Sequence, residues 1–269
     1  MKKTILITGA TDGIGLETAR MLVSAGQMVL IHGRNPEKLD AVTQQLSQIP
    51  GSRPVEGFLA DLSDLESTAG LAREITRNHS RLDVLINNAG VYKVSGHVTR
   101  QGLDTRFSVN TLAPYLLTKQ LLPLFDASGR IINLSSAAQA PLDPEALAGP
   151  SSLGDDVVYA QSKLALTMWS GALGRSLKDA GPAVIAVNPA SFLGSKMVKQ
   201  AYGVAGKDLG IGADILCRAA LSDEFANASG LYFDNDSGQF SQPHPQALDP
   251  ELCRQVIQRM ETVLARQIS

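Results

Sequence analysis

Thr8-Gly9-Ala10-Thr11-Asp12-Gly13-Ile14-Gly15 is the strongest indication of the fold in this chain. It follows a β-branched run, Thr4 to Thr8, that predicts a strand, and it opens a segment, Gly13 to Ala25, with the length and composition of a crossover helix. Small residues at such a turn let backbone N–H groups approach a pyrophosphate at the positive end of a helix. A glycine-rich turn that only reverses the chain is the alternative, and it loses weight inside a βαβ unit.

The same alternation of strand-sized apolar runs and helical periods continues along the chain. Further strands are expected at residues 28–32, 55–59, 82–87, 130–134, 183–188 and 231–233. Further helices are expected from Asn35 and Pro36 to Ile49, after a Ser63/Glu66 capping box, and at residues 104–125, 157–180, 211–221 and 252–265. The pattern predicts an α/β fold of three layers, a doubly wound parallel sheet (Rossmann fold) in one domain, residues 1–269.

Composition excludes several classes of function. Hydrophobic residues make up 44% of the chain and charged residues 19%, which is typical of a globular protein, and the net charge of -2 offers no basic field for nucleic acid. No apolar stretch approaches the roughly 20 residues that cross a bilayer, so we expect no membrane insertion. Cys217 and Cys253 lack the spacing of a disulfide framework or a metal site. The four histidines show no metal-ligand spacing. We therefore expect no metal, reduced thiols and a cytoplasmic protein.

The end of the second predicted strand carries the signal for the cofactor. The sequence there is Ile31-His32-Gly33-Arg34-Asn35, with no carboxylate before Glu37 to bind a free ribose 2'-hydroxyl. The planar guanidinium of Arg34 suits a 2'-phosphate, so NADP(H) is favoured over NAD(H). A solvated surface arginine is the alternative, and Asp12 in the glycine loop adds no positive charge and slightly weakens the case.

Tyr159 and Lys163 are candidates for acid/base chemistry because residues four apart share one face of a helix. Lowering the pKa of a phenol by two or three units needs roughly 3 to 4 kcal/mol, and one close cation supplies about 4 kcal/mol. Tyr115 and Lys119 have the same spacing but lie among leucines, where a tyrosine usually packs with its hydroxyl satisfied. Ser135-Ser136 ends a strand near the expected ligand edge, where a hydroxyl could polarise a carbonyl or only cap the chain locally.

These residues stand in an ordered set of motifs that resembles the short-chain dehydrogenase/reductase family over nearly the whole chain. The matches are Thr8 to Gly15, Asp61-Leu62, Asn87-Asn88-Ala89-Gly90, Ser108-Val109-Asn110, Ile132-Asn133-Leu134-Ser135-Ser136, Tyr159-Ala160-Gln161-Ser162-Lys163 and Val187-Asn188-Pro189. The chain departs from the family at Ala190, where glycine is common, and at Ser195, which replaces a usual threonine.

The resemblance implies a set of roles for individual residues. Asn110 would support a proton-relay water, Ser136 would bind the substrate oxygen, Tyr159 would be the acid/base, and Lys163 would lower the pKa of that phenol and hold ribose. Asp61 and Leu62 would lie near the adenine and Asn87 near the nicotinamide ribose. The full set of expected cofactor contacts is Gly9, Thr11, Asp12, Gly13, Ile14, Gly15, Arg34, Asn35, Asp61, Leu62, Asn87, Ala89, Gly90, Tyr159, Lys163, Pro189 and Ser195.

Between Ser136 and Tyr159 lie 22 residues, a length similar to that of the retinol dehydrogenase-like branch. We interpret residues 138–158 as a substrate loop and residues 191–210 as a variable segment, with a surface insertion as the alternative for the loop. The sequence thus predicts an NADP-dependent oxidoreductase for a small-molecule carbonyl or alcohol. A non-catalytic dinucleotide-binding regulatory or scaffold protein is the alternative, and a sugar-nucleotide epimerase is disfavoured by the chain's length. Family resemblance also implies a homodimer or homotetramer.

Overall fold

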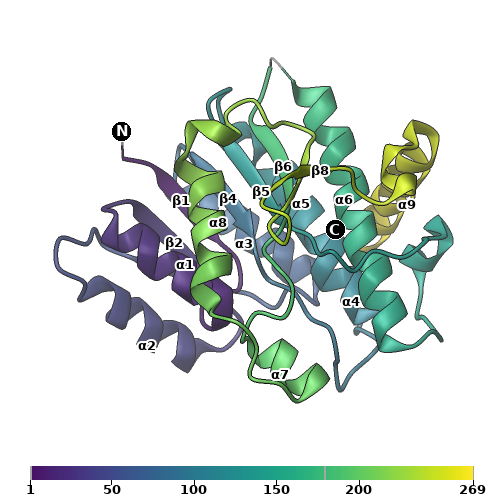
Figure 1. Ribbon diagram of the computed structural model, residues 1–269, viewed down its shortest axis with the longest axis horizontal. Helices are drawn as coiled ribbons and strands as arrows, with labels where there is room; N and C mark the ends of the chain where they lie inside the picture. The colour runs from purple at the N-terminus through teal and green to yellow at the C-terminus, as the bar shows by residue number, and fades with distance from the viewer. Residues whose placement is uncertain (1, 179, 269) are drawn as a thin grey trace.

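The computed structural model describes residues 2–178 and 180–268, with the backbone alone for residues 201 and 202 (Figure 1). In this part of the chain eight strands form one sheet in the order β3-β2-β1-β4-β5-β6-β7-β8, parallel from β3 to β7, with β8 antiparallel to β7. The strands are β1 (Thr4–Ile7), β2 (Met28–Gly33), β3 (Glu56–Leu59), β4 (Val84–Asn87), β5 (Arg130–Leu134), β6 (Ala183–Asn188), β7 (Tyr232–Asp234) and β8 (Gln239–Ser241).

Helices cover both faces of the sheet, which gives the three-layer α/β architecture that the sequence predicts. One face holds α1 (Gly13–Ser24), α2 (Pro36–Ser47) and α8 (Leu209–Leu221). The other holds α3 (Leu65–Asn78), α4 (Thr105–Phe107), α5 (Ala113–Leu121), α6 (Asp155–Leu177) and α9 (Pro250–Gln267). Alternate residues of the strands enter the two apolar cores, as Ile5 and Ile7 do on one side and Leu6 on the other.

The helix predicted over residues 104–125 is a composite of four segments. Asp104 caps α4, a π-helical segment η1 (Ser108–Leu112) follows, then α5, then the 3-10 segment η2 (Leu122–Leu124). A π-helical turn carries one extra residue and often marks a functional position. Here it contains Asn110, whose side chain bonds the backbone of Val91, a contact that a helical period in the sequence does not reveal.

Two other predictions need correction. The cap of α3 is Asp64, which accepts from Glu66 N and Ser67 N, while the Ser63 hydroxyl bonds Asp61, so the capping box is wrong. The helix predicted over residues 157–180 is α6, which starts earlier and ends at Leu177; residue 179 lies outside the described residues.

Several elements were not predicted because they are short and carry no periodic apolar pattern. They are α7 (Lys196–Tyr202), β8 and the 3-10 segment η3 (Pro144–Ala148), together with the short 3-10 segments η4 (Asp223–Phe225) and η5 (Pro245–Leu248). Strand β8, for example, has two exposed residues and one half-buried residue. Such segments lack the periodicity from which elements are predicted.

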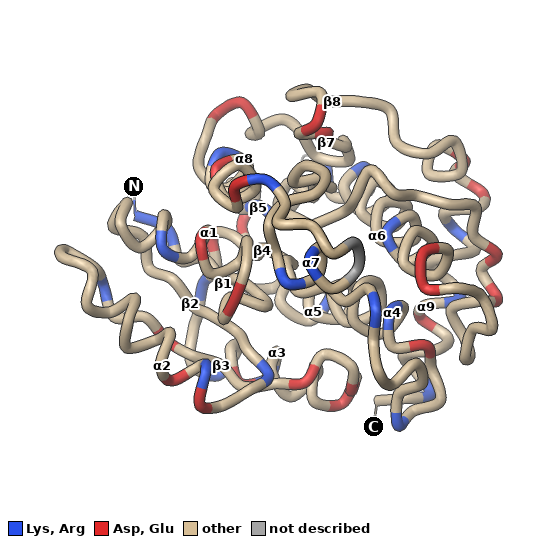
Figure 2. Tube along the Cα trace, turned by 60° about the horizontal axis from the view of Figure 1, so that its bottom comes forward, with Lys and Arg blue, Asp and Glu red and all other residues tan. Residues whose placement is uncertain are grey.

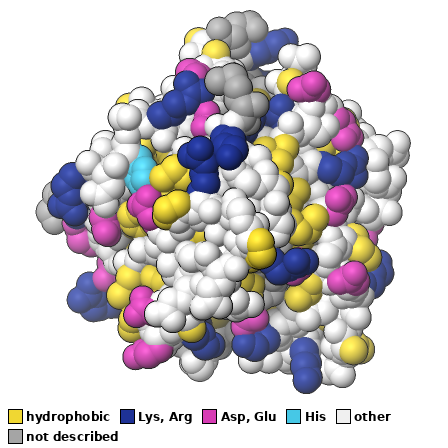
Figure 3. Space-filling model, turned by 90° about the vertical axis from the view of Figure 1, so that its left-hand side faces the viewer, with side chains coloured by type: hydrophobic (Ala, Val, Ile, Leu, Met, Phe, Trp, Pro, Cys, Tyr) yellow, Lys and Arg dark blue, Asp and Glu magenta, His cyan; other side chains and the backbone are white. Residues whose placement is uncertain are grey.

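Charged residues are spread along the whole described trace (Figure 2), and basic and acidic side chains are interspersed on the face that holds the amino terminus (Figure 3). No helix among the described residues is both long and apolar enough to span a membrane. Within the same residues, no cluster of three or more histidine, cysteine, aspartate or glutamate side chains could hold a metal ion.

Candidate active site

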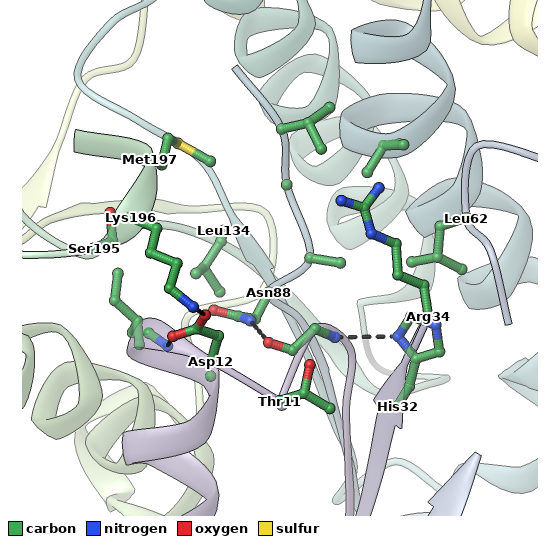
Figure 4. Close-up of a pocket in the computed structure, with 18 of the residues that line it drawn as sticks. Thr11, Asp12, His32, Arg34, Leu62, Asn88, Leu134, Ser195, Lys196 and Met197 are labelled. Carbon is green, nitrogen blue, oxygen red and sulfur yellow. Dashed lines mark hydrogen bonds and ion pairs between the residues drawn. The ribbon is translucent and has the colours of Figure 1, made fainter. Parts of the chain in front are cut away.

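A pocket of about 340 Å³ lies where the strand order reverses between β1 and β4. Chain segments leave these two strands in opposite directions, which opens a crevice at their carboxyl ends. Figure 4 shows Arg34, His32 and Leu62 at one end of the pocket and Ser195, Lys196 and Met197 at the other. The predicted residues that line it are Gly9, Thr11, Asp12, Gly13, Ile14, Gly15, Arg34, Asp61, Leu62, Ala89, Gly90, Tyr159, Lys163, Pro189 and Ser195.

The glycine loop is held against the neighbouring strand by Asn88. Its Nδ2 donates to the carbonyl oxygens of Thr8 and Gly9 at 2.8 and 3.0 Å. Gly9 has a φ of +65°, and a Cβ there would lie 2.9 Å from the Cα of Ala89. Glycine is therefore required at this position by both conformation and space, and the loop is built as a rigid backbone surface.

His32, at the end of β2, fixes the same loop from the other side. Its Nδ1 accepts from Gly9 N at 3.1 Å, and its Nε2 lies 3.0 Å from the carbonyl oxygen of Ala60. Burial lowers the pKa of His32 to about 4. The ring is therefore neutral near pH 7, with Nδ1 as acceptor and the Nε2 proton donated to Ala60.

Lys163 is buried beside Tyr159. Its Nζ lies 5.8 Å from the centroid of the Tyr159 ring and donates to the carbonyl oxygen of Leu134 at 2.7 Å. Burial lowers the pKa of this ammonium to about 8. A Cβ at Gly90 would lie 3.4 Å from Nζ, so glycine keeps the space over the ammonium open toward the pocket.

Asn110 stands behind this pair and does not line the pocket. Its Oδ1 accepts from Val91 N at 2.8 Å, and its Nδ2 donates to Val91 O and to Ser162 Oγ, each at 2.9 Å. The Ser162 hydroxyl in turn donates to the carbonyl oxygen of Tyr159 at 2.7 Å. Because both Nδ2 protons are used within the protein, the side chain of Asn110 positions the Tyr159 turn and has no N–H group left for a water.

The first turn of α6 is tied to the segment after β4. The rings of Tyr92 and Tyr159 meet edge to face with centroids 4.9 Å apart, and the Tyr92 hydroxyl donates to Asp156. The fully buried Arg106 binds Asp155, the first residue of α6. These contacts fix the position of Tyr159 within the pocket wall.

Ser136 and Asn87 lie outside the lining of the pocket. The Ser136 hydroxyl accepts from Ala138 N at 3.1 Å and so caps the chain locally, which is the alternative to a contact with substrate. Asn87 is buried, and its Nδ2 donates to Asn133 Oδ1 and Thr118 Oγ1. Its neighbour Asn88 lines the pocket instead.

One end of the pocket is formed by Asp61, Leu62 and Arg34, and Arg34 is exposed. Asn35 does not line this pocket: its side chain caps α2 by accepting from Lys38 N, and the residue lines a neighbouring cavity of about 850 Å³. That cavity shares Arg34 with the pocket.

The second Tyr/Lys pair is structural. Tyr115 donates to Glu261 Oε1 at 2.6 Å, and Lys119 binds the same oxygen at 3.2 Å. Burial, followed by the hydrogen bond to Glu261, raises the pKa of Tyr115 above its ordinary value. The pair lines neither of the two cavities described above, as its position among leucines predicts.

Ser135 lines the pocket at the ligand edge predicted for Ser135-Ser136. Further residues line it that were not predicted: His32, Gly33, Asn88, Val91, Val109, Leu134, Lys196 and Met197. Asn88 could have been found, because it lies inside the Asn87-Asn88-Ala89-Gly90 motif. Lys196 could not have been found, because it is distant from the glycine loop in sequence and contacts Asp12 only in the folded protein.

Comparison with known proteins places the chain in a family. Residues 3–203 match a family model described as short chain dehydrogenase. Human retinol dehydrogenase 13 is 32% identical over 273 residues, covering 94% of this chain and 82% of that protein. A solved structure from Mycobacterium paratuberculosis has a TM-score of 0.81 at 26% identity, covering 98% of this chain and 93% of the other. A short chain dehydrogenase from Escherichia coli CFT073 complexed with NADPH has a TM-score of 0.71 at 26% identity, with 87% and 96% covered.

Proposed function

The chain belongs to the short chain dehydrogenase family, in its retinol dehydrogenase-like branch, and is an oxidoreductase of CH–OH and C=O groups; on this basis we propose that it uses NADP(H), with Tyr159 as acid/base. One observation carries the assignment of Tyr159. The buried ammonium of Lys163 lies 5.8 Å from its ring, in the wall of a pocket that the glycine loop also lines.

The residues present fit a nicotinamide dinucleotide. Gly9, Gly13 and Gly15 present a backbone surface at the start of α1, which suits a pyrophosphate. Asp61 and Leu62 would hold the adenine side, and Arg34 would bind a 2'-phosphate with its planar fork. At the other end, the space kept open by Gly90 would let Lys163 donate to ribose hydroxyls.

When bound, the dinucleotide supplies or accepts the hydride, and side chains of the protein transfer the proton. In carbonyl reduction the Tyr159 hydroxyl donates its proton to the substrate oxygen, and in alcohol oxidation the phenolate takes it back. The positive charge of Lys163 stabilises that phenolate. Asn110 and Ser162 hold the main chain of Tyr159, so the hydroxyl keeps its place in the pocket wall.

Ser136 would bind the substrate oxygen by donating its hydroxyl proton, which stays available while the hydroxyl oxygen accepts from Ala138 N. It follows Ser135, which lines the pocket. Residues 138–158 and 191–210 would shape the substrate site. We expect a small-molecule carbonyl or alcohol, and a homodimer or homotetramer in the cytoplasm; light scattering that finds a monomer at micromolar concentration would contradict the oligomer.

The test is a panel of carbonyl and alcohol substrates followed by NADPH and NADH absorbance. We expect turnover of at least one compound with NADPH preferred. Tyr159→Phe should lose this turnover, and the matched control is Tyr115→Phe, which removes the hydroxyl of a tyrosine that does not line the pocket. A protein that binds NADPH but turns over nothing on a broad panel would favour the scaffold alternative.

A further inference from the structure

An ion pair joins the glycine loop to α7. Asp12, the N-cap of α1, accepts from Gly13 N at 2.8 Å with one carboxylate oxygen and binds the Lys196 ammonium with the other (Figure 4). The two residues are 184 positions apart in sequence. Ser195 lies beside them, because a Cβ added to Gly13 would be 3.8 Å from the Cβ of Ser195. The start of α7 therefore borders the mouth of the pocket.

The carboxylate of Asp12 lies where the proposed function requires an anion, the pyrophosphate, to bind. Burial opposes its charge, but hydrogen bonds from Lys196 and Gly13 outweigh that effect and hold the pKa of Asp12 below its ordinary value. The group is thus ionised at neutral pH, at the positive end of α1. A pyrophosphate brought to the same helix end meets this negative charge at short range.

Lys196 is placed to cancel that repulsion. Of the cations among the described lining residues, Lys163 lies beside Tyr159 and Arg34 lies at one end of the pocket, while Lys196 alone pairs with the loop carboxylate. Its side chain is 67% exposed and that of Asp12 is 50% exposed, so solvent screens the pair and its contribution to stability is small. The charge of Lys196 also acts on an incoming dianion, with a sign opposite to that of Asp12.

We propose that Lys196 determines dinucleotide affinity by compensating the charge that Asp12 presents to the pyrophosphate. The inference rests on the proposed function, because it requires that the pocket bind a dinucleotide. It assigns a role to two residues that lie on different elements and that the hydride and proton chemistry does not use.

The experiment is calorimetric titration of NADP⁺ into the full chain and three variants. Asp12→Asn removes the charge but keeps a side-chain oxygen that can cap α1. We expect Lys196→Met to raise the Kd about tenfold, and Asp12→Asn to lower it or leave it within about twofold. The double variant should return to within about threefold of the wild type, because both charges are gone.

Two controls separate charge compensation from other effects. Lys199→Met removes a positive charge from the same helix at a position that lines neither cavity, and Lys196→Arg keeps the charge at the site. Both should bind NADP⁺ within about threefold of the wild type. Thermal unfolding of each variant checks that the fold is intact, as the exposure of both side chains predicts.

Three results would overturn the inference. If the double variant binds NADP⁺ as weakly as Lys196→Met, Lys196 binds the ligand independently of Asp12. If all variants bind NADP⁺ with equal affinity, the pair has no role in binding. A wild-type protein that binds neither NADP⁺ nor NAD⁺ refutes the proposed function, and the inference with it. The first two results leave the proposed function standing.

Discussion

Lys163 donates a 2.7 Å hydrogen bond to the carbonyl oxygen of Leu134, at the end of β5, from a side chain that is almost wholly buried. The bond points the ammonium back toward the sheet edge and holds it beside the Tyr159 ring. Burial of a cation with a neutral acceptor is unfavourable, which is why the pKa of Lys163 falls to about 8. Stability is given up here for a charge that the proposed chemistry requires.

Lys163→Met tests directly whether the buried charge of Lys163 lowers the stability of the protein. Between pH 8 and the ordinary lysine value of 10.5 the unfolded chain binds more protons than the folded protein, so wild-type stability rises with pH across this window. At pH 7 the variant should therefore be more stable by about 1 to 3 kcal/mol, with the gap closing toward pH 10.5. Turnover should fall at least about 100-fold. A variant less stable than the wild type at pH 7, by an amount independent of pH, would refute this account.

Arg34→Ala tests the preference for NADP(H). Loss of the planar guanidinium should raise the Kd of NADP⁺ about tenfold or more and leave that of NAD⁺ within about twofold, because NAD⁺ lacks the 2'-phosphate. The control is Arg53→Ala, another exposed arginine, which does not line the pocket. Equal losses for both dinucleotides would contradict a role for Arg34 in discrimination.

His32 makes the protein sensitive to acid. Its pKa is lowered to about 4 by burial, so below the ordinary value of 6.5 the unfolded chain binds a proton that the folded protein does not. Wild-type stability should drop by about 3 kcal/mol as the pH falls from 6.5 to 4. His32→Ala lacks this group and should lose less over the same range, which urea unfolding at several pH values would measure. Parallel pH curves for the two proteins would exclude the effect.

Ala190 stores backbone strain at the edge of the pocket. Its φ of 112° lies in a region that residues with a Cβ rarely adopt. Ala190→Gly should raise the stability by about 1 kcal/mol, because relief of strain outweighs the added entropy of the unfolded chain. Ala183→Gly, in the extended strand β6, should instead destabilise the protein. Thermal unfolding measures both, and a loss of stability in Ala190→Gly would show that the strain is small.

Local patterns in the sequence were enough for much of the site. The glycine loop, Arg34 and the Tyr159/Lys163 pair each depend on residues that are close in sequence and on a known place in a βαβ unit. The parallel sheet and its helices follow from apolar periodicity, and the departure at Ala190 coincides with a strained φ.

Contacts between distant segments could not be predicted in this way. The bonds of His32 to Gly9 and of Lys196 to Asp12 depend on how β2 and α7 meet the glycine loop, and neither leaves a periodic trace. The π-helical turn around Asn110 depends on its bonds to Val91 and Ser162, which come from two other elements. The motif predicts Asn87 at the cofactor, whereas the buried bond to Asn133 holds its side chain outside the lining of the pocket.

The most direct measurement of the central claim compares Tyr159→Phe with the wild type, using a substrate found in the carbonyl and alcohol panel. The phenylalanine keeps the ring against Tyr92 and removes the hydroxyl alone. We predict that kcat falls at least about 1000-fold while the Kd of NADP⁺ stays within about threefold. Full turnover by Tyr159→Phe, with the same substrate and cofactor, would contradict the assignment of this phenol as the acid/base.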